Sequence, residues 1–165
     1  MLDRHGRAVL ERGIRPVARS LGRVGVTPDA LTASGLVFSL GAALLIGSGH
    51  LVWGIVALAL SGATDMLDGA VAKASGAGSP RGSFFDSVAD RVSDSLVLCG
   101  VAWYLADQEP RLAVLAMAAL ALSLTISYER AKAESLGFDA RGGVMERAER
   151  MILIGARPSR SAGRP

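Results

Sequence analysis

Long, nearly uncharged apolar runs constrain the fold of this chain more than any other feature of its sequence. Half of the 165 residues are hydrophobic, which is typical of a membrane protein. With their flanking residues, the runs each approach the roughly 20 residues that a helix needs to cross a bilayer. The sequence therefore predicts an all-α fold, a polytopic membrane helix bundle. The four runs are Ala30–Gly49, Leu51–Leu67, Val92–Ala106 and Leu112–Tyr128.

Basic residues lie unevenly between these runs and predict an orientation. Several arginines precede the first run, Lys73 and Arg81 follow the second, and further basic residues follow the fourth. The turns at the other ends of these runs, 47–49 and 108–111, contain only one basic residue, Arg111. By the positive-inside rule, the N-terminus and the polar clusters face the cytoplasm. We therefore expect a multi-pass protein of the cell (plasma) membrane whose polar clusters, and any site that they form, face the cytoplasm.

The first 25 residues have the pattern of an amphipathic helix. Apolar residues recur there at spacings of four and three, with arginines on the other faces. Such a helix lies along an anionic leaflet, whereas a solvated basic tail, the alternative, needs no apolar stripe. We therefore expect three parts: this interfacial helix at 1–25, a transmembrane domain at 26–156 and a basic tail at 157–165.

Breaker residues predict where the helices begin and end. Thr27-Pro28-Asp29 is a typical helix start, because proline suits the first turn and Thr27 or Asp29 accepts bonds from free N–H groups. Glycine and proline clusters predict turns at 47–49, 76–80, 108–111 and 137–143. A fifth helix is expected to begin in 145–156, but its apolar part is too short to span a membrane.

Four aspartates in a short stretch predict a metal site. Asp65 and Asp68 fall on one face of a helix, and Asp86 and Asp90 fall on one face of the next helix. Each uncompensated carboxylate in a bilayer costs about 3 kcal/mol, so four cost on the order of 10 kcal/mol, and their mutual repulsion adds to this cost. A divalent cation removes both penalties.

The donor types indicate which cation is bound. Neither histidine nor cysteine lies near the aspartates, and the single cysteine, Cys99, is expected to be a packing residue inside an apolar run. All-oxygen ligation favours Mg²⁺ or Mn²⁺, two such ions suit phosphoryl chemistry, and calcium stays possible. The alternative is structural: the aspartates cap helices or pair with nearby cations, and Asp94 is either a further site residue or a polar neighbour.

The same stretch resembles the signature of the CDP-alcohol phosphatidyltransferases. The resemblance rests on Asp65-Met66-Leu67-Asp68-Gly69-Ala70-Val71-Ala72-Lys73, followed by Gly82-x-x-x-Asp86-x-x-x-Asp90. It extends from the N-terminal helix to about Ile154 and departs at Lys73, where the family usually has arginine. That change keeps the positive charge but loses bidentate phosphate binding.

The resemblance implies an activity and a role for each motif residue. The substrate is a CDP-linked lipid, here CDP-diacylglycerol, and an acceptor hydroxyl attacks the lipid-proximal phosphorus and releases CMP. Asp65, Asp68, Asp86 and Asp90 are implied metal ligands, and Asp90 is also the implied catalytic base. The implied contacts to the nucleotide or the CDP-lipid are Thr27, Pro28, Asp29, Ala30, Gly69, Ala72, Lys73, Ser79 and Gly82. For Gly69, Ser79 and Thr27, the alternatives are helix packing, a turn and a helix cap.

Two later segments, 127–134 and 142–150, resemble the actinobacterial phosphatidylinositol phosphate synthases within that family. There, cationic residues bind the phosphate of the acceptor, inositol phosphate. The matching residues are Arg130, Lys132, Arg147 and Arg150. Alternatively, these residues form an ordinary cytoplasmic fringe that interacts with anionic lipid. Besides the bilayer and the two substrates, the resemblance implies a homodimer, and no nucleic-acid partner is expected.

Other functions stay open at this point. Within the family, the acceptor could instead be glycerol phosphate, serine or free inositol. Intramembrane carboxylates also mark divalent-cation transporters. Because the family implies six spans and this sequence stops partway through the fifth, we also consider an inactive, truncated remnant.

Overall fold

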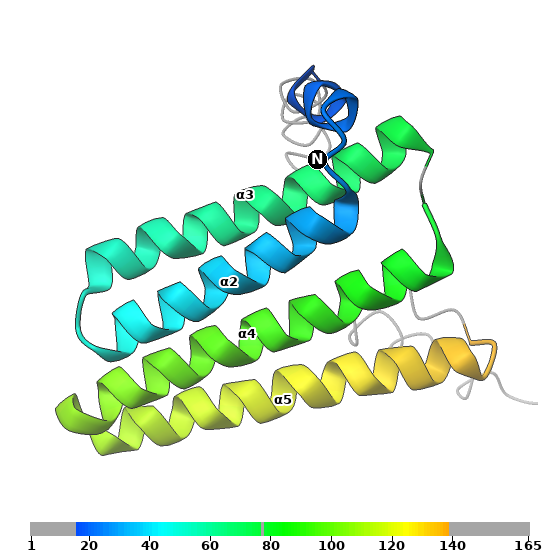
Figure 1. Ribbon diagram of the computed structural model, residues 1–165. Coiled ribbons are helices and arrows are strands. Elements are labelled where there is room, and N and C mark those ends of the chain that lie inside the picture. Colours follow the sequence, from blue (N-terminus) through cyan, green and yellow to red (C-terminus); the bar gives the residue numbers. More distant parts are fainter. Residues whose placement is uncertain (1–15, 77, 139–165) are drawn as a thin grey trace, which may run out of the picture. The chain divides into compact units, whose positions relative to one another are not determined.

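A computed structural model describes residues 16–76 and 78–138, and these residues are helical apart from short connections. The helices are α2 (Pro28–Gly47), α3 (Leu51–Ser75), α4 (Pro80–Gln108) and α5 (Pro110–Ser135) (Figure 1). Residues 16–23 are also helical, while residues 1–15 of the expected amphipathic helix and the expected fifth apolar helix lie outside the described residues. No strand occurs in the described ranges, which confirms the all-α class.

Three of these helices are long and apolar enough to cross a membrane: α2, α3 over Leu51–Ala74, and α5. The third expected run, Val92–Ala106, is part of a longer helix, because α4 begins at Pro80, at the end of the predicted 76–80 turn. The first half of α4 contains Asp86, Asp90 and Arg91, which makes this helix more polar than the other three. All four expected runs thus lie in helices, of which three are apolar along most of their length and α4 is mixed.

Large apolar side chains on these helices point outward. Val37 on α2, Val52 on α3 and Val114 on α5 are 69%, 73% and 68% exposed, respectively. Soluble monomers rarely expose contiguous apolar surface of this extent. The outward residues instead suit contact with lipid, in agreement with a membrane protein.

Helix ends follow the capping residues of the sequence. Thr27 precedes α2 and accepts a 3.2 Å hydrogen bond from the Ala30 N–H, with Pro28 as the first helical residue. α3 ends before Gly76, whose φ of +64° lies in the left-handed region that favours glycine. The expected start at Thr27-Pro28 is confirmed, and the predicted turns at 47–49, 76–80 and 108–111 fall at helix connections, although their end residues belong to the flanking helices. Residues 139–143 of the last predicted turn lie outside the described residues.

α2 packs against both α3 and α4 (Figure 1). Glycines allow the close approach: a Cβ atom on Gly100 of α4 would lie 2.5 Å from the carbonyl oxygen of Ala43 in α2. At the α2–α3 contact, the buried Ser39 and Ser61 hydroxyl oxygens are 2.7 Å apart, and Ser61 donates to the Gly35 carbonyl at 3.0 Å. Small residues and interhelical hydrogen bonds are the usual means of packing helices in lipid.

The chain divides into two compact units, Met1–Leu124 and Thr125–Pro165, with the boundary inside α5. The predicted metal ligands all belong to the first unit, whereas Arg130 and Lys132 belong to the second. The predicted parts 1–25, 26–156 and 157–165 stay predictions.

Candidate active site

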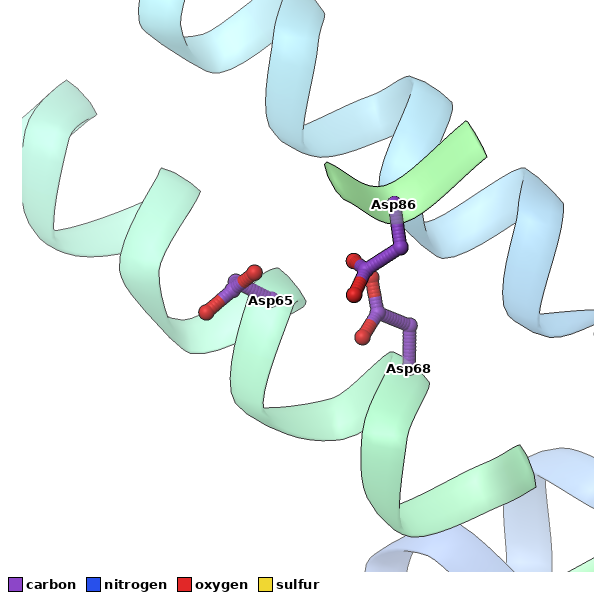
Figure 2. A group of neighbouring side chains, drawn as sticks. All are labelled: Asp65, Asp68 and Asp86. Atoms are coloured by element: carbon purple, nitrogen blue, oxygen red, sulfur yellow. The ribbon is translucent and has the colours of Figure 1, made fainter. Parts of the chain in front are cut away.

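Three of the four predicted carboxylates form a cluster. Asp65 and Asp68 come from successive turns of α3, and Asp86 comes from α4. Each offers one oxygen, and these oxygens all lie within 4.8 Å of one another. Figure 2 shows the carboxylates of Asp68 and Asp86 pointing toward each other. Two helices therefore supply the cluster, as the helical spacing predicted.

The environment of the cluster suits a cation. Asp68 is only 5% exposed, and Asp86 Oδ1 is buried without a hydrogen-bond partner among the described residues. A buried, unpartnered carboxylate oxygen is costly, and three like charges at this distance repel one another. Mg²⁺ and Mn²⁺ prefer oxygen ligands, and a Mg²⁺ ion with bonds of about 2.1 Å holds its ligand oxygens at comparable separations. The residues present therefore fit a divalent cation.

Asp90 lies outside this group of three. The Nη2 atom of Arg91 is 3.6 Å from Asp90 Oδ2 and 3.8 Å from Asp94 Oδ2. Because these side chains are about half exposed, each pair contributes little to stability. Pairing with a nearby arginine, the structural alternative, therefore applies in part to Asp90 and Asp94. The roles of Asp90 as a metal ligand and as a base stay predictions.

A cavity of about 620 Å³ joins the aspartates of both helices. Asp65 and Asp68 line it from α3, and Asp90 and Asp94 line it from α4. Apolar residues such as Leu58 and Val97 complete the wall. The cavity is large enough for part of a substrate, and its wall carries serine and threonine hydroxyl groups as well as the carboxylates.

The predicted nucleotide contacts lie around helix termini. Ser79 caps α4 by accepting a 3.0 Å hydrogen bond from the Gly82 N–H, a structural role that differs from the turn considered as its alternative. A Cβ atom on Gly82 would lie 3.8 Å from Asp29 Oδ1, so the beginnings of α2 and α4 are neighbours. Asp29 and Gly82, predicted separately as nucleotide contacts, are thus brought together.

On α3, Gly69 borders open space. It is exposed, and a Cβ atom placed on it would meet no atom within 4 Å. Packing against another described helix therefore does not explain this glycine. Ala72 is half-buried one turn later, and Lys73 is exposed in the last turn of the helix.

Thr32 is a site residue that the sequence analysis missed. Its hydroxyl oxygen is 2.7 Å from Asp68 Oδ2, and the side chain is buried. Threonine in an apolar helix is common and gives no signal by itself. The one sequence feature that pointed to Thr32 is its position four residues after Pro28, directly beyond the predicted nucleotide segment 27–30.

The predicted acceptor contacts are only partly described. Arg130 Nε donates a 3.2 Å hydrogen bond to Glu134 Oε1 on the same helix, and Lys132 is exposed. Arg147 and Arg150 lie outside the described residues. The assignment of these four cations to phosphate binding stays a prediction.

A membrane helix bundle with clustered carboxylates beside a cavity defines a metal-binding membrane protein. Residues 25–158 match the family model of the CDP-alcohol phosphatidyltransferases, and the chain belongs to this family. The sequence resemblance is thereby confirmed.

Within this family, the chain is similar to phosphatidylinositol phosphate synthases. The chain is 37% identical to phosphatidylinositol phosphate synthase from Corynebacterium glutamicum, over 93% of this chain and 72% of that protein. The crystal structure of Mycobacterium tuberculosis phosphatidylinositol phosphate synthase with CDP-DAG bound is 39% identical, with a TM-score of 0.74, over 87% of this chain and 73% of that one. A structure of the same enzyme with manganese and citrate has a TM-score of 0.73 and 39% identity, over 86% of this chain and 69% of that one.

Proposed function

We propose that this protein transfers the phosphatidyl group from CDP-diacylglycerol to a hydroxyl of inositol phosphate and releases CMP. The observation that carries the proposal is the cluster of Asp65, Asp68 and Asp86, whose oxygens lie within 4.8 Å beside a cavity in a chain of this family. The similarity to phosphatidylinositol phosphate synthases supports the choice of acceptor.

The clustered carboxylates would hold Mg²⁺ or Mn²⁺, and we propose two ions. A bound divalent cation neutralises the diphosphate and stabilises the charge that develops on its oxygens. The protein's own part is to fix the ligands: Asp65 and Asp68 are held one turn apart on a rigid helix, and Asp86 approaches from α4. Pre-positioned ligands lower the cost of organising the substrate at the moment of reaction.

The CDP moiety is proposed to lie between the beginnings of α2 and α4 and the open face at Gly69. Helix N-termini carry free N–H groups and partial positive charge, so two neighbouring termini favour a phosphate group. Gly69 lets the nucleotide approach the backbone of α3, since no side chain fills that space. Lys73 adds a positive charge in the last turn of α3.

Asp90 is proposed to accept the proton of the attacking hydroxyl. It lines the same cavity as Asp65 and Asp68 but is not one of the three clustered carboxylates. A carboxylate is a weak base for an alcohol, so much of the acceleration must come from orientation and charge stabilisation. The acceptor phosphate is assigned to Arg130, Lys132, Arg147 and Arg150, and the family resemblance further implies a homodimer in the plasma membrane.

The acceptor is tested by measuring CMP release from membranes that contain the protein. The membranes are supplied with CDP-diacylglycerol, Mg²⁺ and one acceptor at a time: inositol phosphate, glycerol phosphate, serine or free inositol. We expect release with inositol phosphate only. Release with glycerol phosphate or serine, but not with inositol phosphate, would contradict the proposed acceptor while leaving the reaction class intact.

A further inference from the structure

One buried hydrogen bond joins α2 to the carboxylate cluster. Thr32 Oγ1 lies 2.7 Å from Asp68 Oδ2, and the two residues are 8% and 5% exposed, respectively. A hydroxyl that donates to a carboxylate makes a short, charge-assisted bond, and in a site shielded from water such a bond restricts the acceptor's orientation. Asp68 is therefore held from a second helix as well as by its own.

The same hydroxyl has a second acceptor within reach. The Pro28 carbonyl oxygen is 3.1 Å from Thr32 Oγ1, in the first turn of α2. A hydroxyl has a single hydrogen, and the ionised carboxylate is both the nearer and the stronger acceptor. The proton is thus assigned to Asp68, while the Pro28 contact places the Thr32 side chain beside the segment that begins α2.

We propose that Thr32 is a positioning residue for Asp68, orienting this carboxylate for divalent-cation binding without itself being a ligand. The inference rests on the proposed function only in requiring that the cluster bind a cation. Outer-shell hydrogen bonds to metal ligands typically change metal affinity by 10- to 100-fold. Thr32 also links the first turn of α2, near the proposed nucleotide contacts, to the cluster on α3.

The test compares Thr32→Val, which keeps the shape but removes the hydroxyl, with Thr32→Ser, which keeps the hydroxyl. The dissociation constant of Mn²⁺ is measured by calorimetry on purified protein in lipid nanodiscs, without any substrate. We expect Thr32→Val to weaken Mn²⁺ binding about 10-fold or more, and Thr32→Ser to stay close to the unsubstituted protein. The melting temperature is recorded for each variant.

Thr64→Val is the matched control. Thr64 lies at the same α2–α3 contact, but its hydroxyl donates to the Ser61 carbonyl of its own helix at 2.7 Å. This control should bind Mn²⁺ normally. If Thr32→Val does not fold, Thr32→Ala provides the same comparison against Thr32→Ser.

The outcomes distinguish failure of the positioning role of Thr32 from failure of the metal site. Unchanged Mn²⁺ binding in Thr32→Val, or equal losses in the Val and Ser variants, would overturn the positioning role while leaving the metal site in place. Absence of Mn²⁺ binding in the unsubstituted protein would instead overturn the metal site and the proposed function with it.

Discussion

Asp68 is the most constrained of the clustered carboxylates. It is almost fully buried, accepts a hydrogen bond from Thr32 and lies within 4.8 Å of oxygens from Asp65 and Asp86. Asp90, by contrast, is about half exposed and faces Arg91. These different surroundings favour different roles: a fixed ligand at Asp68 and a residue at Asp90 that is accessible to an acceptor hydroxyl.

Replacing Asp90 by Asn should abolish the base while largely preserving the cluster. We expect kcat to fall by about 100- to 10,000-fold, the range typical of general-base loss. Binding of a CDP-lipid should change far less, because Asp65, Asp68 and Asp86 remain. Single-turnover CMP release and equilibrium CDP-lipid binding measure the two quantities. Asp107→Asn, near the opposite end of α4, is the control, and normal turnover in Asp90→Asn would remove Asp90 as the base.

Replacing Gly69 by Ala tests the open face of α3. A Cβ atom at this position meets no atom within 4 Å, so the variant should fold with an unchanged or slightly raised melting temperature. If the nucleotide approaches the backbone here, the added methyl group should raise the KM for CDP-diacylglycerol by about 10-fold, as expected for roughly 1.4 kcal/mol of lost binding. Gly41→Ala, also in open space but on α2, should leave this KM unchanged. Equal KM values for both variants would contradict the proposed nucleotide path.

At the scale of helices, much of the arrangement was readable from the sequence because capping residues act locally. Thr27-Pro28 begins α2 and Ser79-Pro80 begins α4, since each pair supplies an acceptor and a residue with a fixed φ. Hydropathy alone would place the start of α4 too late, because charged residues lie in its first turns, but the predicted 76–80 turn and the spacing of Asp86 and Asp90 already indicated a helix there. A local pattern also does not reveal which helix a residue will meet, so the contacts Thr32–Asp68 and Gly100–Ala43 were not predicted.

The contact between α2 and α4 gives a prediction for stability. A Cβ atom on Gly100 would lie 2.5 Å from the Ala43 carbonyl oxygen and 2.7 Å from its Cα atom, and backbone atoms do not move aside easily. Gly100→Ala should therefore destabilise the protein by about 1–3 kcal/mol, as overpacking does. Thermal unfolding in nanodiscs measures the loss. Gly41→Ala controls for the helix propensity of alanine, and a melting temperature of Gly100→Ala equal to that of this control would contradict the close packing.

Across the whole molecule, apolar surface and charge placement together indicate how the chain lies in a membrane. The helices expose large apolar side chains, and the polar cluster lies toward the end of α3 and the beginning of α4. The loop between these two helices is flanked by Lys73 and Arg81, whereas the α4–α5 connection is followed by Arg111. By the positive-inside rule, we expect the α3–α4 loop to face the cytoplasm.

Single-cysteine labelling tests this orientation. In a Cys99→Ala background, a membrane-impermeant maleimide should label Gly78→Cys in inside-out vesicles but not in intact cells. Glu109→Cys, in the connection between α4 and α5, should show the reverse pattern. Labelling of Gly78→Cys from outside intact cells would contradict the cytoplasmic position of the active site.

The crowding of three acidic side chains also has a thermodynamic consequence for the protein's lifetime. Without counter-ions their repulsion opposes folding, so a divalent ion that binds only the folded form should protect against heat. Linkage predicts a gain of about 2.7 kcal/mol when free Mn²⁺ is 100 times its dissociation constant. Chelation by EDTA should lower the melting temperature, and Mn²⁺ should restore it, in the unsubstituted protein but not in Asp86→Asn; a melting temperature insensitive to chelation would contradict this. Cellular supply of divalent ions would thus set how long the folded enzyme persists, as well as how fast it works.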